Sequence, residues 1–231
     1  VETINALDRG YSLLKNNALT QAIEAVAVNM RMRNEEVKAY EWTHTFHPVA
    51  IPEGPPDRSR LPCVERRLLW AIVAGHDRPE TWTASARPAD VHFLKGIVAE
   101  FAAELGLDLG LDTADPAHAL YASLHPNRQA VVTLDGEPVG VLGEVHPAIC
   151  RAHKLKNVRP CYLEVDADAL TSPGVSARYT EPSPFHVIVR SLAFTLPHRF
   201  EAGDVAAWLS ANGPEWLERV AITDLFEHQE A

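Results

Sequence analysis

The chain has 231 residues, of which 46% are hydrophobic and 23% charged, a balance typical of folded domains rather than of disordered segments. Its 31 acidic and 21 basic residues give a formal charge of −10, which argues against a general nucleic-acid coat and confines any RNA contact to a local basic patch. The three cysteines have no CxxC spacing and favour a reduced, cytoplasmic setting, and no apolar run approaches the about 20 residues of a membrane helix.

The N-terminal third of the chain predicts a helix, a strand and a loop. Residues 12–30 carry one apolar stripe at helical spacing, which fits a helix lying on a sheet or one at a subunit interface. Residues 37–46 alternate along two faces and predict a half-buried antiparallel strand. Five prolines in residues 47–62 predict a loop.

The next segment predicts a buried strand and a second helix. Residues 66–74 form a continuous apolar run that is typical of an inner strand. Residues 89–105 repeat apolar side chains at i+4, and Gly106 is a natural helix stop. Residues 108–116 are expected to be a connector.

A β-hairpin is the most distinctive local prediction. Residues 129–134 and 139–144 read as two short strands joined through Asp135 and Gly136, a dipeptide that supplies the positive φ a tight turn needs. A basic segment follows at residues 151–159, and residues 161–167 predict another strand. Helices packed against antiparallel strands predict an α+β fold.

The C-terminal part predicts a separate, smaller domain. Residues 171–184 contain prolines and a glycine and are the best linker. After it come a predicted strand at 187–196, a helix at 202–211 and a strand at 220–226. This β-α-β order is half of a ferredoxin-like unit, whose edge would stay unpaired, so we expect the chain to be part of a longer protein.

No catalytic or metal-binding motif is found. The chain has no GxxxxGK[ST], GxGxxG, GxSxG or HExxH string. Asp166 and Asp168 follow a strand and fit a capping role as well as acid–base chemistry. Six histidines stand in pairs along the sequence but do not have the spacing of metal ligands; they are His44 and His47, His118 and His125, and His146 and His153.

Two basic regions could contact RNA. Arg151, Lys154 and Lys156 concentrate positive charge in one segment, which could also be an ordinary solvated loop. In the C-terminal part, basic and aromatic side chains that could bind phosphates or stack on bases are Arg190, His198, Arg199 and Phe200. Phe194 alternates with apolar neighbours and reads rather as core.

The order of these parts resembles the β subunit of bacterial-type phenylalanyl-tRNA synthetase. Tyr40, Thr43, His186 and Ser191 stand where that family usually has Phe, Gly, Pro and Asp. The strings that carry the resemblance are YEWTHTF at 40–46, Trp82, DVHFLKG at 90–96, H-P-x-R at 125–128, G-x-x-G-E-x-H-P at 140–147 and FHVIVRSLAF at 185–194.

The resemblance implies a division of labour between two subunits. Residues 1–170 would form a class II synthetase-like module without an active site of its own, packed against an α subunit that uses ATP, Mg²⁺ and phenylalanine. Residues 171–184 would be a linker, and residues 185–231 the first half of a ferredoxin-like anticodon-binding domain. The implied partners are the α subunit and tRNA(Phe), with no membrane or DNA partner, and this chain would itself bind no cofactor or metal.

Two other functions stay open from the sequence. The replacements at His186 and Ser191 and the acidic total charge also fit a divergent paralogue that binds RNA or protein without a role in aminoacylation. An independent hydrolase or transferase would need Asp166, Asp168 or the histidines to meet in one pocket.

Overall fold

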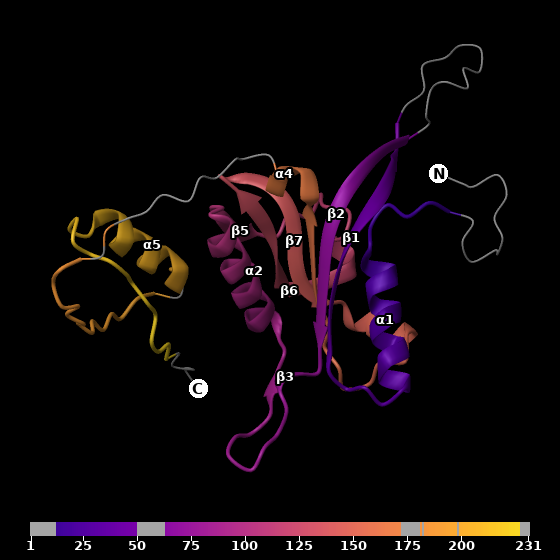
Figure 1. Cartoon of the computed structure of the whole chain (residues 1–231), viewed down its shortest axis with the longest axis horizontal. Helices are drawn as coiled ribbons and strands as arrows, with labels where there is room; N and C mark the ends of the chain where they lie inside the picture. Colours follow the sequence, from indigo (N-terminus) through magenta and orange to yellow (C-terminus); the bar gives the residue numbers. More distant parts are fainter. Residues whose placement is uncertain (1–12, 50–62, 172–180, 182, 198, 227–231) are drawn as a thin grey trace. The chain divides into compact units, whose positions relative to one another are not determined.

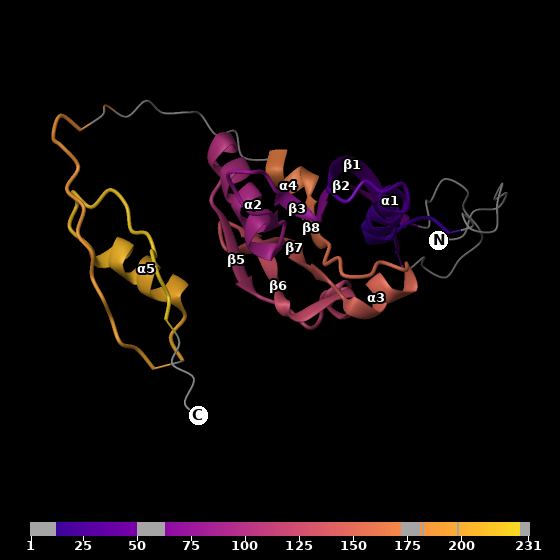
Figure 2. The ribbon, with the colours of Figure 1, turned by 90° about the horizontal axis from the view of Figure 1, so that it is seen from below.

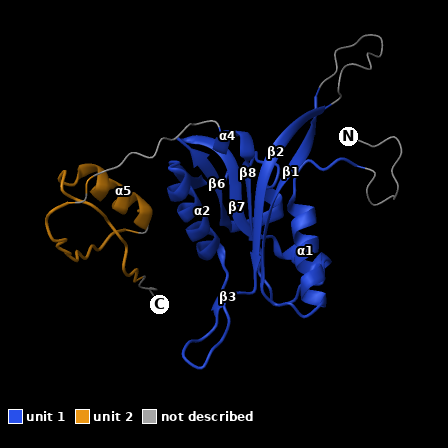
Figure 3. Cartoon of the chain, viewed as in Figure 1, with its two compact units in different colours: residues 1–178 blue, residues 179–231 orange. Residues whose placement is uncertain are grey.

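The computed structural model describes residues 13–49, 63–171, 181, 183–197 and 199–226. The chain divides into two compact units, residues 1–178 and 179–231 (Figure 3). The predicted linker at residues 171–184 lies largely outside the described residues. In the described part, no helix has the length and apolar character needed to cross a membrane.

The first unit is built on a six-stranded antiparallel sheet, as the α+β prediction requires. The strand order is β1-β2-β8-β7-β6-β5, and a separate two-stranded ribbon, β3-β4, lies beside it. The strands are β1 (Val37–Pro48), β2 (Cys63–Ala74), β3 (His76–Arg78), β4 (Arg87–Pro88), β5 (Leu109–Thr113), β6 (Leu124–Leu134), β7 (Glu137–Val145) and β8 (Cys161–Asp166).

Helices cover both faces of this sheet. Helix α1 (Leu19–Arg31) lies on one side and α2 (Val91–Leu105) on the other (Figures 1 and 2). Three shorter helical segments connect or follow strands; they are η2 (Tyr121–Ser123), α3 (Pro147–Ala152) and α4 (Ala167–Thr171). The first unit therefore has a sheet between two helical layers, and each face of the sheet has its own core.

The strands divide their side chains between two hydrophobic cores. Ile72 pairs with Tyr162, and both face the α1 core together with Trp70. Leu69 and Val165 are also opposite one another, and they face the α2 core. This alternation explains the continuous apolar run in the second half of β2, since both of its faces are buried there.

The predicted helices are present, with one late start. Helix α2 begins after Asp90, whose carboxylate accepts hydrogen bonds from the backbone N–H groups of His92 and Phe93 at 3.0 Å, and it ends at Gly106 with a φ of 64°. Helix α1 begins at Leu19 rather than near residue 12. The Asn17 side chain accepts a hydrogen bond from the Leu19 N–H at 3.1 Å, and this local contact competes with helix formation.

The predicted hairpin is confirmed as β6 and β7, both longer than expected. Asp135 and Gly136 have φ of 52° and 84°, as the tight turn between strands requires. The predicted connector at residues 108–116 is wrong in part, because Leu109–Thr113 is strand β5, paired with β6. Helix α3 was not predicted, since six residues are too few to reveal a helical period.

In the described residues of the second unit, the predicted helix forms and the predicted strands do not. Helix α5 (Ala202–Asn212) matches the prediction, but residues 187–196 and 220–226 carry no strand. A split β-α-β unit needs a further strand between its two parallel strands, and the described residues of this unit contain no strand. The ferredoxin-like unit is therefore not formed in the described residues, and their apolar side chains are exposed, Phe194 among them.

Candidate functional site

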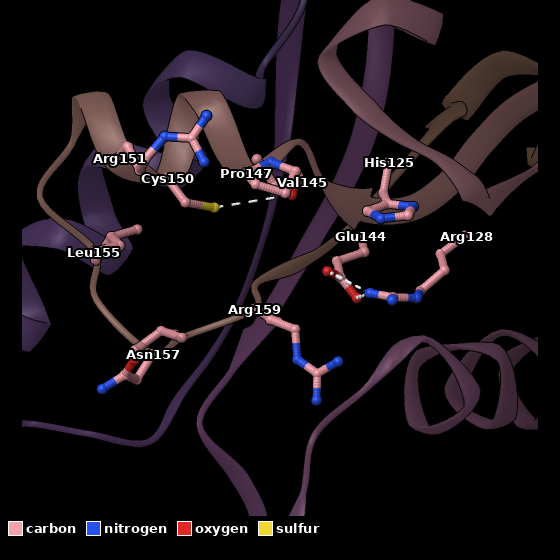
Figure 4. Close-up of a pocket in the computed structure, with 11 residues that line it drawn as sticks. His125, Arg128, Glu144, Val145, Pro147, Cys150, Arg151, Leu155, Asn157 and Arg159 are labelled. Atoms are coloured by element: carbon pink, nitrogen blue, oxygen red, sulfur yellow. Dashed lines mark hydrogen bonds and ion pairs between the residues drawn. The ribbon is translucent and has the colours of Figure 1, made fainter.

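A cavity of about 430 Å³ lies where β6, β7, α3 and the loop before β8 meet (Figure 4). Its lining includes three arginines, and part of it comes from the H-P-x-R and G-x-x-G-E-x-H-P strings that carry the family resemblance. Its lining residues are His125, Arg128, Glu144, Val145, Pro147, Cys150, Arg151, Leu155, Asn157, Val158 and Arg159.

A bulge at residues 125–128 of β6 places His125 and Arg128 in the lining of the cavity. Leu124 pairs with Val145 and Gln129 with Gly143, so residues 125–128 lie opposite Glu144 alone. Extra residues bend a strand and re-aim its side chains. Arg128 Nη1 consequently donates to both Glu144 carboxylate oxygens, at 2.8 and 2.7 Å, although Glu144 is only 7% exposed.

Two glycines allow the strands around the cavity to approach closely. A Cβ atom at Gly140 would lie 2.1 Å from the carbonyl oxygen of Glu164 on β8. A Cβ atom at Gly143 would lie 2.8 Å from Cβ of Gln129. The G-x-x-G spacing thus serves strand packing rather than phosphate cradling.

Helix α3 forms the wall opposite Arg128 and has defined ends. His146 caps it, because its Nδ1 accepts a hydrogen bond from the Ala148 N–H at 3.2 Å, and Pro147 occupies the first turn. At the other end Lys154 N–H donates to Arg151 O and Leu155 N–H donates to Cys150 O, at 3.0 and 2.9 Å. Lys154 has a φ of 60°, so this is a Schellman motif with lysine at the usual glycine position.

Two buried cysteines lie in or near the cavity: Cys150 lines it, and Cys161 pairs with Glu144 across the sheet. Burial raises the pKa of the Cys150 thiol above its ordinary value, with a contribution from the negative charge of Glu144, so this lining residue stays protonated. Behind the cavity, burial likewise raises the pKa of Cys161 to about 12. Neither cysteine has the low pKa of a nucleophile.

The carboxylates suggested for acid–base chemistry have structural roles. The Asp166 side chain caps α4 by accepting hydrogen bonds from the N–H groups of Asp168 and Ala169, at 2.8 and 3.4 Å. Asp168 forms an ion pair with Arg67, whose Nε lies 2.6 Å from its carboxylate. The two groups do not converge on a pocket, so the hydrolase or transferase hypothesis loses its main candidates.

The histidines act as turn and strand residues. His118 and His125 accept hydrogen bonds through Nδ1 from the backbone N–H two residues later, at 3.1 and 3.2 Å. His47 contacts Thr45, and His44 lies 3.8 Å from Glu65. Among the described residues, no group of three metal-ligating side chains gathers in one place.

The residues proposed for RNA contact fall in both units. Arg151, Lys154 and Lys156 are exposed on α3 and the loop that follows it. In the second unit Arg190 and Arg199 are exposed, and Arg199 lies over the Phe200 ring at 5.0 Å; His198 lies outside the described residues. Sequence reasoning missed Arg128, Glu144 and Arg159 as parts of one site, although the H-P-x-R and G-E-x-H-P strings marked the first two.

A second cavity, of about 510 Å³, lies beside the start of α2. Its arginine already has a partner: Arg87 pairs with Asp77, and this hydrogen bond lowers the Asp77 pKa. Asp90 caps α2. The first cavity is the stronger candidate, because some of its cations lack such partners.

Comparison with known proteins gives a consistent result. Residues 1–167 match the family model described as the phenylalanyl tRNA synthetase beta chain CLM domain. The chain is 27% identical over 228 residues to the phenylalanine–tRNA ligase beta subunit of Staphylococcus epidermidis strain ATCC 35984, covering 98% of this chain and 27% of that protein. It is 28% identical over 233 residues to the beta subunit of Synechococcus sp. strain JA-3-3Ab, covering 99% and 27%. The chain thus spans about a quarter of the length of these relatives.

Proposed function

The chain belongs to the phenylalanyl-tRNA synthetase β-chain CLM domain family, and from that premise we propose that it works as part of the β subunit of a phenylalanine–tRNA ligase. The observation that carries the proposal is coverage: the relatives align with 98% and 99% of this chain. The matching strings run through both units, so the likeness is not limited to one motif.

The chain's role in this proposal is architectural. Glu144, Gly140, Gly143 and His146 support strand packing, an ion pair and a helix cap, and none of them faces a catalytic partner group in the described residues. An α subunit would then bind ATP, Mg²⁺ and phenylalanine and carry out activation and transfer. The six-stranded antiparallel sheet with helices on both faces supports a class II synthetase-like module for residues 1–170.

The second unit would contribute to tRNA(Phe) binding in the cytoplasm. We propose that residues 185–231 are the start of an anticodon-binding domain whose sheet forms only together with strands from outside the described residues. Exposed Arg190 and the Arg199–Phe200 pair supply charge and a stacking surface. His198 is part of the same proposal, as are Arg151, Lys154 and Lys156 in the first unit.

Purification of the full-length protein that contains this chain tests the proposal. We expect a second chain that binds ATP and phenylalanine to co-purify, and phenylalanine-dependent pyrophosphate exchange to require that chain. Exchange by the present chain alone would contradict the division of labour. Binding of RNA without any associated α chain or aminoacylation would instead favour the divergent paralogue.

A further inference from the structure

The cavity of Figure 4 has an excess of positive charge inside an acidic protein. Arg128, Arg151 and Arg159 line it, and Glu144 is the only carboxylate among its lining residues. The surrounding sequence repeats this bias: between Glu144 and Glu164 there is no acidic residue, whereas the whole chain has a formal charge of −10. An anion is therefore attracted here and repelled by most of the remaining surface.

The Arg128–Glu144 pair leaves part of the arginine available. Arg128 uses Nη1 alone to reach both oxygens of Glu144. Its Nε and Nη2 donate to no other group within the described part of the chain. Because the carboxylate is buried and Arg128 is 41% exposed, Glu144 holds the guanidinium at the cavity and leaves its outer donors unpaired.

Arg151 on α3 and Arg159 in the loop before β8 line the same cavity from opposite sides (Figure 4). Neither forms an ion pair with any described carboxylate. Hydrogen bonds hold the backbone at each of the two arginines. Arg151 O accepts the Lys154 N–H of the Schellman motif, and the carbonyl of Pro160, the residue after Arg159, accepts the Val145 N–H at 2.8 Å. The two side chains are thus cations on an ordered backbone, and the described part of the chain gives them no counter-ion.

We propose that this cavity binds a phosphate group. Guanidinium groups present planar sets of N–H donors that match phosphate oxygens, and here three of them line one cavity, with Asn157 and His125 beside them. Lys154 and Lys156 are exposed on the adjoining loop and continue the positive charge beyond the cavity. That extension favours a chain of phosphates, as in an RNA backbone, over a single acidic side chain. The RNA source rests on the proposed function; the phosphate site does not.

Titration of the chain with inorganic phosphate tests the site directly. Isothermal titration calorimetry and backbone NMR shifts of residues 144–159 are the measurements. We expect saturable binding, and we expect the double variant Arg151→Gln/Arg159→Gln to weaken it about tenfold or more, because charge-assisted hydrogen bonds are lost. Both side chains are exposed, so an unchanged melting temperature is expected to show that the variant folds.

Arg66→Gln is the matched control. Arg66 is an exposed arginine near the start of β2. Val73, near the other end of β2, pairs with Cys161, and Cys161 pairs with Glu144 of the cavity. Arg66 therefore lies at the end of β2 that is remote from the cavity. It changes the net charge in the same way as each cavity substitution, so phosphate binding should be retained. Equal loss in the control and in the double variant, or equal binding by all three proteins, overturns the proposal.

A second titration identifies the source of the phosphate. An unmodified tRNA transcript is titrated at several salt concentrations, with inorganic phosphate as competitor. If RNA supplies the phosphate group, the slope of log K against log salt concentration for RNA binding becomes shallower in the double variant, by the equivalent of about one to two phosphate contacts. If phosphate binding needs Arg151 and Arg159 but RNA binding does not, the site takes a free phosphate or a small phosphorylated molecule.

The failures of the two proposals are distinguishable. A chain that binds phosphate through these arginines but associates with no α chain loses the proposed function and keeps this site. A ligase complex whose chain binds neither phosphate nor RNA through them loses the site alone. Saturable binding of an acidic peptide through Arg151 and Arg159, with no phosphate binding, also overturns the proposal.

Discussion

Arg128 on β6 and Glu144 on β7 form an ion pair in which one nitrogen, Nη1, lies 2.8 and 2.7 Å from the two carboxylate oxygens. The pair spans the β6 bulge and joins the H-P-x-R string to the G-E-x-H-P string. These two strings belong to the resemblance, yet the contact between them is structural. They hold the edge of one cavity in place.

Loss of the arginine should destabilise the fold. Arg128→Met leaves Glu144 buried without its two hydrogen bonds, so we expect the free energy of unfolding to fall by about 1.5–3 kcal/mol. Urea unfolding measures the change. Adding Glu144→Gln should recover part of the loss, because the uncompensated charge disappears; purely additive effects of the two substitutions would contradict this coupling.

The two glycines of β7 should not tolerate a methyl group. Gly140→Ala brings Cβ within 2.1 Å of a backbone oxygen on β8, and Gly143→Ala brings it within 2.8 Å of the Gln129 side chain. We expect both substitutions to lower the melting temperature, Gly140→Ala more strongly because its Cβ would lie 2.1 Å from a backbone oxygen, against 2.9 Å from Arg128 O for Gly143→Ala.

Gly96→Ala is the control for this pair. Nothing lies within 4 Å of a Cβ atom at Gly96, which is inside helix α2. Alanine there should stabilise the protein by about 0.5–1 kcal/mol through helix propensity. A Gly140→Ala protein as stable as Gly96→Ala would show that β7 and β8 can separate without cost.

Lys154 should be replaceable by glycine with a gain in stability. Its φ of 60° is unfavourable for a residue with a Cβ atom, so Lys154→Gly should stabilise the fold by up to about 1 kcal/mol. Lys156→Gly removes the same charge at a position without positive φ and should not stabilise. Thermal unfolding of the two variants separates the backbone effect from the charge effect.

The protein should lose stability in alkaline solution. Burial, with the charge of Glu164, raises the pKa of Tyr162, whose hydroxyl donates to Glu164 at 2.7 Å. The folded state keeps a proton that the unfolded chain releases near pH 10, so the Tyr162 contribution to stability is complete below about pH 10 and declines above it, by up to about 1.4 kcal/mol per pH unit.

Cys161 adds a contribution of the same sign. Its folded pKa of about 12 exceeds the unfolded value of about 8.5, so its share declines from about pH 8.5 to 12. Unfolding by urea at several alkaline pH values measures the sum. Tyr162→Phe should reduce the slope above pH 10, and an unchanged slope in that variant would assign the effect elsewhere.

The three thiols should differ in reactivity. Cys63 is partly exposed, whereas Cys150 and Cys161 are buried and have raised pKa values. A limiting maleimide treatment at neutral pH should label Cys63 alone, and labelling in urea should reach all three. Mass spectrometry of the intact chain measures this, and Cys63→Ser should abolish the fast label. Fast double labelling would contradict the burial of the other two.

Sequence patterns predicted those elements whose cause is local. The Asp135–Gly136 turn and the Gly106 stop of α2 follow from backbone conformations that those residues favour. The apolar run of β2 follows from burial on both faces. Strand β5 was missed because its short pattern becomes a strand only through pairing with β6.

The candidate site was predicted in pieces. Arg151, Lys154 and Lys156 stood out as a basic segment, and the H-P-x-R and G-E-x-H-P strings stood out as a resemblance. Their meeting at one cavity depends on the β6 bulge, which no periodicity reveals. The predicted strands of the second unit failed for a related reason, since a strand forms only by pairing with another strand and the described residues of that unit contain none.

By itself the sequence determined the α+β character, the hairpin, the two long helices and the likeness to one family, because propensity, alternation and turn chemistry act between residues close in the chain. Only the tertiary structure decided that Arg128 faces Glu144 and that Arg151 and Arg159 line the same space without counter-ions among the described residues. Strand register and side-chain neighbours arise from hydrogen bonds between distant segments, and the charge balance of a cavity exists only after those segments have packed.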